Sequence, residues 1–142
     1  MKMVTLAMAM LITAPTLAAD LALVFTKASG YEHSIVARKG KPLSFAEQRL
    51  KTMLEARGLT VECTKDGTVF DGDLSRFKLF VFFTHGDLLE AGKDGQPPMT
   101  PAGKAALLKA VAAGTRTLLF VRSSSTTRYQ AAEMLRIQAP RA

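Results

Sequence analysis

The sequence predicts an open, parallel α/β sheet of about four strands, with helices on both faces of the sheet. Apolar segments alternate with helical segments in the order strand, helix, strand, short helix, strand, helix, strand. The segments "LALVFT" (21–26) and "KLFVFFT" (78–84) are nearly continuous apolar runs, which is typical of strands buried on both faces. A parallel sheet therefore fits better than an antiparallel one.

The first helix is the clearest element. Residues 44–58 begin with Ser44 and Glu47 at the spacing of a capping box, and they end at Gly58, which suits a left-handed stop. Residues at helical spacing are expected to form its inward face: Ala46, Leu50, Met53 and Leu54.

The next segment predicts a second strand at 59–63, followed by a turn at 64–67. Cys63 is the single cysteine of the chain and lies on this strand, so we expect a small buried side chain rather than a nucleophile. Asp73 is placed to cap a single turn before the third strand.

The last predicted helix covers residues 100–114. Thr100 is the expected cap, Pro101 fits the first helical position and Gly114 the stop. The expected inward residues are Leu107, Leu108 and Val111. Residues 117–121, "TLLFV", predict a fourth strand.

The connections place a candidate site at one edge of this sheet. Right-handed crossovers and the commonest strand order put the first strand between the second and the third. Ligands of such sheets bind where the chain reverses direction, beyond the carboxyl ends of the strands. The two loops at that point carry Lys27, Tyr31, Glu32 and His33, and Thr84, His85 and Asp87.

These residue types suit proton transfer near neutral pH. Either His33 with Glu32 or His85 with Asp87 can supply a base and an orienting carboxylate. The alternative is that these side chains only pin two loops through hydrogen bonds to the backbone. His33, His85 and Asp87 also form a mixed set of three possible metal ligands, so a divalent metal stays a weaker alternative.

Two other kinds of site are not expected. "TKASGY" and "THGD" match neither a dinucleotide-binding loop nor a P-loop. No glycine flanks the serines of "RSSST" (122–126), as a nucleophile elbow requires.

The net charge of +7 is unevenly distributed. Residues 20–114 carry thirteen Lys or Arg and eleven Asp or Glu, whereas residues 115–142 carry five Arg and one Glu. A nucleic-acid-binding domain concentrates basic residues on one structured surface. We therefore expect no nucleic-acid partner.

Residues 1–19 predict a secretory signal peptide, because Lys2 precedes an apolar stretch that ends in small residues. Cleavage after Ala18 or Ala19 leaves a periplasmic or secreted chain with no stable membrane anchor. A buried N-terminal helix is the alternative.

Three segments closely resemble the ThuA-like, or trehalose-utilisation, family: residues 22–36, 44–89 and 96–114. The most specific parts are "FTKASGYEHS" and "FFTHGDLL". The family's histidine motif maps to His33 and Ser34, and its Thr-x-Gly-Asp motif maps to Thr84, Gly86 and Asp87.

The resemblance implies a flavodoxin-like, three-layer α/β/α fold related to class I glutamine amidotransferases, without their cysteine nucleophile. It also implies sugar-related metabolism, including processing of oxidised disaccharides, and a small carbohydrate as ligand. The candidate catalytic residues are then His33, His85 and Asp87. The candidate ligand-binding residues are Lys27, Tyr31, Glu32, Ser34, Thr84 and Gly86.

The resemblance stops near Gly114, so residues 20–114 are the expected domain and 115–142 an atypical Arg-rich segment. Family members continue with a glycine-rich strand, a His-Ser/Ala-Asp segment and roughly another hundred residues. We expect 115–142, through a shifted reading frame or a divergent truncation, not to complete that fold. The amphipathic stretch 129–137 can cover part of one face.

Two function classes follow. One is an exported domain that binds or processes a sugar in the cleft at the carboxyl ends of the strands. The other is a non-catalytic or vestigial carbohydrate-binding domain, which the altered C-terminal segment and the lack of a nucleophile favour. The sequence leaves open whether the chain is an enzyme, and it predicts no oligomeric state.

Overall fold

The four strands of the structure form one parallel sheet in the order β2-β1-β3-β4. The structure is a computed structural model that describes residues 19–121. The strands are β1 (Leu21–Phe25), β2 (Thr60–Thr64), β3 (Phe77–Thr84) and β4 (Arg116–Val121). This is the incomplete flavodoxin-like α/β arrangement that the sequence predicts, with β1 between β2 and β3.

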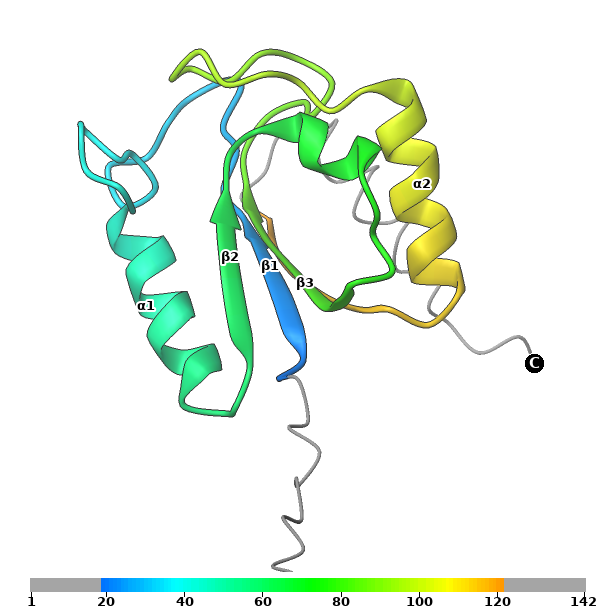
Figure 1. Ribbon diagram of the computed structural model, residues 1–142. Helices are drawn as coiled ribbons and strands as arrows, with labels where there is room; N and C mark the ends of the chain where they lie inside the picture. The colour runs from blue at the N-terminus through cyan, green and yellow to red at the C-terminus, as the bar shows by residue number, and fades with distance from the viewer. Residues whose placement is uncertain (1–18, 122–142) are drawn as a thin grey trace, which may run out of the picture.

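The helices make the outer layers of the fold (Figure 1). Helix α1 (Phe45–Glu55) packs on one face of the sheet, against β1 and β2. The 3₁₀ helix η1 (Gly67–Asp71) and helix α2 (Pro101–Ala112) cover the other face and contact each other. The short helix between β2 and β3 thus begins at Gly67, where the sequence predicts the end of a turn.

Alternation along β1 and β3 divides the core into two clusters. Leu23, Phe25, Phe80 and Phe82 point to the α2 side, where they meet Phe70 of η1. The Phe70 and Phe82 rings stack at 5.7 Å between centroids, and the Phe25 ring meets the Phe70 ring edge-on at 5.0 Å. The α1 side is built from smaller side chains: Ala22, Val24, Val61 and Val81.

Helix α1 begins as predicted. The Ser44 hydroxyl accepts a hydrogen bond from the Glu47 N–H, and the Glu47 carboxylate accepts one from the Ser44 N–H at 2.7 Å. Leu50 and Leu54 lie partly buried against the sheet. Met53 was expected on the inward face, but its side chain is 53% exposed, so that prediction is wrong.

Helix α2 and the segment before β3 also form as predicted. The Thr100 hydroxyl accepts from the Gly103 N–H, Pro101 opens the helix, and Leu107 and Val111 are buried. Asp73 caps a turn by accepting from the Ser75 N–H at 2.9 Å.

Residues 1–18 of the expected signal peptide lie outside the described residues, as do residues 122–142. The residues outside the description include the serines of 122–126 and the stretch 129–137. Within the atypical segment, residues 116–121 pair with β3 as the fourth strand, where "TLLFV" predicts one.

Candidate functional site

The carboxyl ends of β1 and β3 are joined by backbone contacts that continue past the strands. Ala28 and His85 form a parallel bridge. The Ser29 N–H donates to the His85 carbonyl at 2.9 Å, and the His85 N–H donates to the Lys27 carbonyl at 3.1 Å. The two loops that were expected to meet at the reversal of the chain are therefore held side by side.

This contact brings the two histidines together, as expected. The ring centroids of His33 and His85 are 5.8 Å apart at an interplanar angle of 78°. The Tyr31 ring lies 4.8 Å from the His33 ring, also edge to face. Tyr31 is 64% exposed, whereas His33 and His85 are half-buried, so the group of rings meets solvent mainly through Tyr31.

Gly86 makes the close approach of the two loops possible. Its φ is +84°, a conformation that favours glycine. A Cβ at this position would stand 2.2 Å from the Ser29 hydroxyl oxygen and 2.8 Å from the Gly30 nitrogen. Gly86 therefore allows the two loops to pack closely against each other.

His33 is held in place by its own turn. Its carbonyl accepts from the N–H groups of Val36 and Ala37 at 3.0 and 3.1 Å. Ser34, the next candidate residue, lies in this turn and is exposed. The turn presents the imidazole of His33 toward His85, across the gap between the loops.

Lys27 lies beneath the site rather than in it. It is 1% exposed, and its Nζ donates to the carbonyls of Gln96 and Pro97 at 3.1 and 2.9 Å. Burial lowers the pKa of this amine, against the opposing effect of nearby carboxylates. The sequence predicts a ligand-binding role for Lys27, but the structure gives it a fixed place between β1 and the loop before α2.

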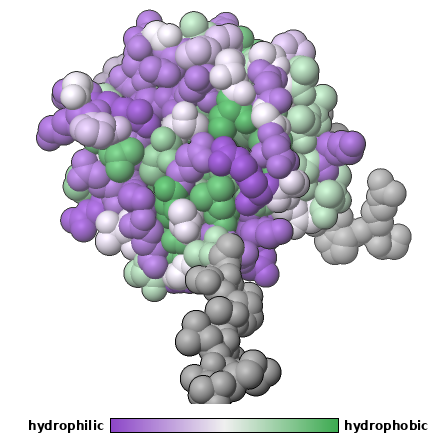
Figure 2. All heavy atoms as spheres, viewed as in Figure 1, coloured by the Kyte–Doolittle hydropathy of each residue, from purple (hydrophilic) through white to green (hydrophobic). Residues whose placement is uncertain are grey.

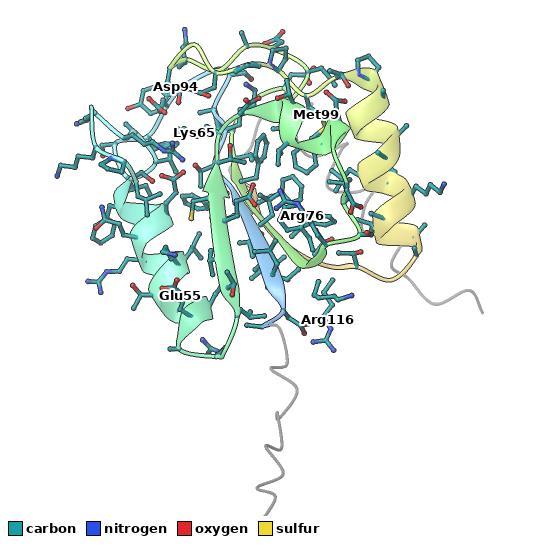
Figure 3. The ribbon with its side chains drawn as sticks, viewed as in Figure 1. Glu55, Lys65, Arg76, Asp94, Met99 and Arg116 are labelled. Carbon is teal, nitrogen blue, oxygen red and sulfur yellow. The ribbon has the colours of Figure 1, made fainter. Side chains whose placement is uncertain are left out.

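Glu32 pairs with Lys65, which is not among the site residues predicted from the sequence. Lys65 Nζ donates to Glu32 Oε1 at 2.7 Å and to the Thr26 carbonyl at 3.2 Å, and it lies 3.4 Å from Asp94 Oδ2. Figure 3 shows Lys65 and Asp94 near each other at this edge of the sheet. Lys65 directly follows β2, and that position at a strand end is the signal that would have found it.

Two other candidate residues serve the loop itself. Asp87 Oδ1 accepts from the Leu89 N–H at 2.9 Å, and the Asp87 carbonyl accepts from the Glu90 N–H. Thr84 is buried at the end of β3. The Asp87 contacts match the alternative in which polar residues pin the loops through hydrogen bonds to the backbone, whereas Glu32 pairs with a side chain.

Glu47 positions the whole loop that bears His33. Its carboxylate is fully buried and accepts from Arg38 Nη2 at 2.7 Å and from the Thr26 hydroxyl at 2.8 Å, besides its capping bond. Burial alone would raise the pKa of this carboxyl, but the hydrogen bonds from Arg38, Ser44 and Thr26 outweigh it and lower the pKa.

The structure also bears on Cys63 and on the possible metal site that the sequence suggests. Cys63 is only partly buried, not fully buried as the sequence predicts. This burial still raises the pKa of its thiol to about 11, which leaves it protonated and unreactive at neutral pH. Among residues 19–121, no three side chains of metal-binding type are grouped closely enough to hold an ion. His33, His85 and Asp87 therefore do not form the three-ligand set considered from the sequence.

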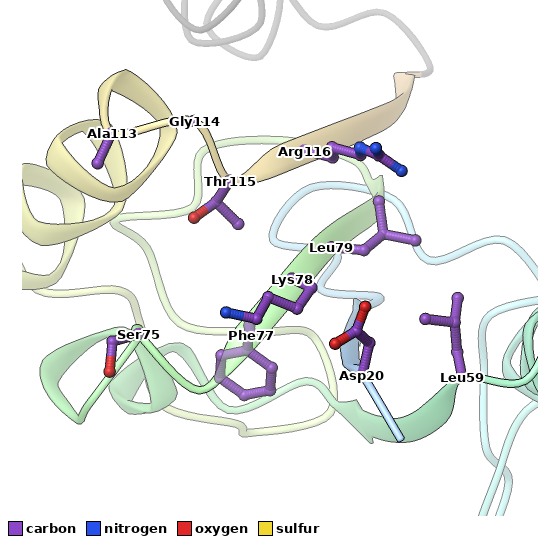
Figure 4. Close-up of a pocket in the computed structure, with 10 residues that line it drawn as sticks. All are labelled: Asp20, Leu59, Ser75, Phe77, Lys78, Leu79, Ala113, Gly114, Thr115 and Arg116. Carbon is purple, nitrogen blue, oxygen red and sulfur yellow. The ribbon is translucent and has the colours of Figure 1, made fainter. Parts of the chain in front are cut away.

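A hollow of about 410 Å³ lies at the opposite edge of the sheet (Figure 4). Its polar lining includes Asp20, Lys78 and Arg116. It is formed at the amino ends of the strands, so none of the candidate residues takes part in it.

Comparison of the chain with protein-family models, with curated proteins and with solved structures finds no match. Within the described part of the chain, no helix has both the length and the apolar character needed to cross a bilayer.

Proposed function

We propose that the edge of the sheet at His33 and His85 is a binding site for a small carbohydrate, in an exported domain of the ThuA-like kind. The observation that carries the proposal is the group of three rings, with His33 and His85 at 5.8 Å and Tyr31 at 4.8 Å from His33. It lies at the point of the fold where α/β sheets of this order bind ligands.

The chemistry of these rings suits a sugar. Imidazole nitrogens donate and accept hydrogen bonds, so two of them can bind neighbouring hydroxyl groups. An exposed Tyr ring offers an apolar face for the C–H groups of a sugar ring and a hydroxyl at its tip. Sugar processing requires in addition a base with a matched partner, and the histidines are the candidates for that role.

One observation favours the second candidate function, binding without turnover. The carboxylate of Glu32 pairs with Lys65, and a carboxylate oxygen of Asp87 accepts from the Leu89 backbone. The carboxylate that was expected to orient His33 is therefore engaged with Lys65, which suits a domain that holds its ligand and leaves it unchanged.

Ligand-observed NMR with the full chain tests the proposal. Saturation transfer is measured with a panel of mono- and disaccharides and their keto derivatives, and each sugar is then checked for a changed product. We expect transfer from at least one sugar, lost in His33→Ala and His85→Ala. Ser75→Ala, at the opposite edge of the sheet, is the matched control and should bind like the parent chain.

The outcomes separate the two candidates. Binding together with a new product supports sugar processing, and binding alone supports the second candidate. Sugar binding that survives both histidine substitutions would place the site elsewhere. No binding to any sugar of the panel would refute the proposal.

A further inference from the structure

The outer face of α1 carries an apolar and basic stripe. Phe45, Arg49 and Met53 follow one another at a spacing of four residues, so they lie on one side of the helix. Phe45 is 60% and Met53 53% exposed, and the Arg49 guanidinium lies 5.4 Å from the centre of the Phe45 ring. The solvent face of such a helix is ordinarily polar.

The loop before α1 lies against the start of this helix. The Ala46 N–H donates to the Ile35 carbonyl at 2.9 Å, which holds the loop against the first turn of the helix (Figure 1). Ile35 is exposed, and so are Lys39 and Lys41 at the tip of the loop. We call Ile35, Lys39, Lys41, Phe45, Arg49 and Met53 the α1 surface.

The charge of the α1 surface is of one sign. Residues 33–53 contain five Lys or Arg and a single acidic residue, Glu47. Glu47 is fully buried and paired with Arg38, so it adds no negative charge to the surface. Lys51 pairs with Glu55, which leaves Lys39, Lys41 and Arg49 as the cations of the surface. The near-neutral total of residues 20–114 conceals this local excess.

Exposed apolar side chains among cations fit an anionic lipid surface. Lys and Arg are attracted by anionic headgroups, while Phe, Ile and Met side chains enter the boundary between headgroups and acyl chains. A soluble polyanion would use the cations and leave the apolar side chains in water. A second copy of the chain would bring cations against cations. Figure 2 shows apolar groups (green) set among hydrophilic ones on the face viewed.

We propose that the α1 surface binds anionic bilayers reversibly and at their surface. Each cation near such a bilayer strengthens binding about fivefold. His33 lies on the same loop as Lys39, so a protein molecule bound to the bilayer holds its candidate sugar site near the lipid. The proposal does not depend on what that site binds.

The lack of tryptophan in the chain allows a direct test. Phe45→Trp places a single indole in the α1 surface, and Leu89→Trp places one at a partly exposed position outside it. The full chain is mixed with vesicles of phosphatidylcholine, alone or with a quarter of phosphatidylglycerol. We expect a blue shift of the indole emission for Phe45→Trp with the anionic vesicles only, and none for Leu89→Trp.

Vesicle sedimentation tests the charges. Lys39→Gln/Lys41→Gln should weaken binding to the anionic vesicles about twentyfold, and Phe45→Ser/Met53→Ser about tenfold. Lys78→Gln/Lys109→Gln, which removes the same charge from exposed positions elsewhere, is the matched control and should lose less than threefold. Residues 1–19 are present in every variant, so differences between variants report the α1 surface.

Three outcomes would overturn the proposal. The first is binding that is equal in all variants. The second is retention on a heparin column without an indole shift on vesicles, which would indicate a polyanion site. The third is a dimer in sedimentation velocity that Phe45→Ser/Met53→Ser abolishes, which would indicate self-association.

Discussion

Glu47 links the helix cap to the candidate site. The same carboxylate caps the N-terminus of α1 by accepting from the Ser44 N–H. It also pairs with Arg38 of the histidine-bearing loop and accepts from the Thr26 hydroxyl at the end of β1. Removal of this buried charge is destabilising, because it leaves the donors that surround it without an acceptor. The position of the loop therefore depends on the ionised form of Glu47.

Glu47→Gln tests this dependence. The pKa of Glu47 is lowered in the folded state, so its contribution to stability is present above the unfolded pKa and is lost as the pH falls through the folded pKa. We expect Glu47→Gln to cost about 3 kcal/mol of unfolding free energy at pH 7. The difference from the parent should shrink below about pH 4.5, as measured by urea unfolding across pH. A difference that does not change between pH 7 and pH 3 would contradict the ionic role.

His33→Ala should separate binding from stability. The ring of His33 lies between Tyr31 and His85 in a surface loop, and such positions usually change stability by less than about 0.5 kcal/mol. We expect the unfolding midpoint to stay nearly constant while the sugar signal in saturation transfer disappears. A clear fall in the midpoint would show that His33 is a structural residue.

The two helices contribute differently to the core. Helix α2 brings fully buried side chains onto the phenylalanine cluster, whereas α1 rests on the sheet through partly buried leucines. The buried side of α2 also depends on Gly103, where an added Cβ would stand 2.9 Å from Asp71 and 3.1 Å from Phe70. The α2 side is therefore the more closely packed of the two.

Leucine-to-alanine substitutions compare the helices. Leu107→Ala on α2 should cost about 2–5 kcal/mol, because the side chain is fully buried. The sequence predicts the same cost for Leu50→Ala on α1. Because Leu50 is only partly buried in the structure, we expect this substitution to lower the unfolding free energy by about 1–2 kcal/mol. Guanidinium unfolding of both variants gives the comparison. A cost for Leu50→Ala equal to that for Leu107→Ala would show that α1 is packed as closely as α2.

Local patterns predicted the ends of both helices better than the burial of their faces. Capping requires only residues within one turn, so Ser44 and Thr100 could be recognised from spacing. The exposure of Met53 depends on how α1 is rotated on the sheet, and periodicity does not determine that rotation. The 3₁₀ helix η1 has a local cap, Asp66, but Gly67 at its start also lies against the backbone of Pro98 and Met99, a contact that no local pattern specifies.

At the scale of the molecule, the two clusters share their central strands. Each of β1 and β3 contributes alternate side chains to both faces, and residues 22–25 of β1 are completely buried. Strands β2 and β4 each pair with one neighbour among the described residues. The central strands should therefore open only when the whole domain unfolds.

Hydrogen exchange can measure this. Amides of β1 and β3 should exchange with the full free energy of unfolding, and those of β2 and β4 through smaller openings. Protection at residues 116–121 would also establish β4 as part of the cooperative unit. Equal, weak protection across all four strands would contradict a single cooperative domain.

The place of the candidate site was predictable, but its internal contacts were not. Strand order alone brings His33 and His85 to one edge of the sheet, because parallel strands end together. The partners of Lys27, Glu32 and Asp87 depend on the paths of two long loops, which no local pattern specifies. Buried lysines that serve the backbone cannot be told from ligand-binding ones by sequence.

Lys65 has a consequence for the order of events in folding. Its amine joins Thr26, Glu32 and Asp94, which lie 39, 33 and 29 positions away along the chain. Contacts between such distant segments carry a large loop-closure cost until the strands have already brought them near. The histidine-bearing loops should therefore settle after the rate-limiting step, so that Lys65→Met accelerates unfolding and leaves the refolding rate nearly unchanged.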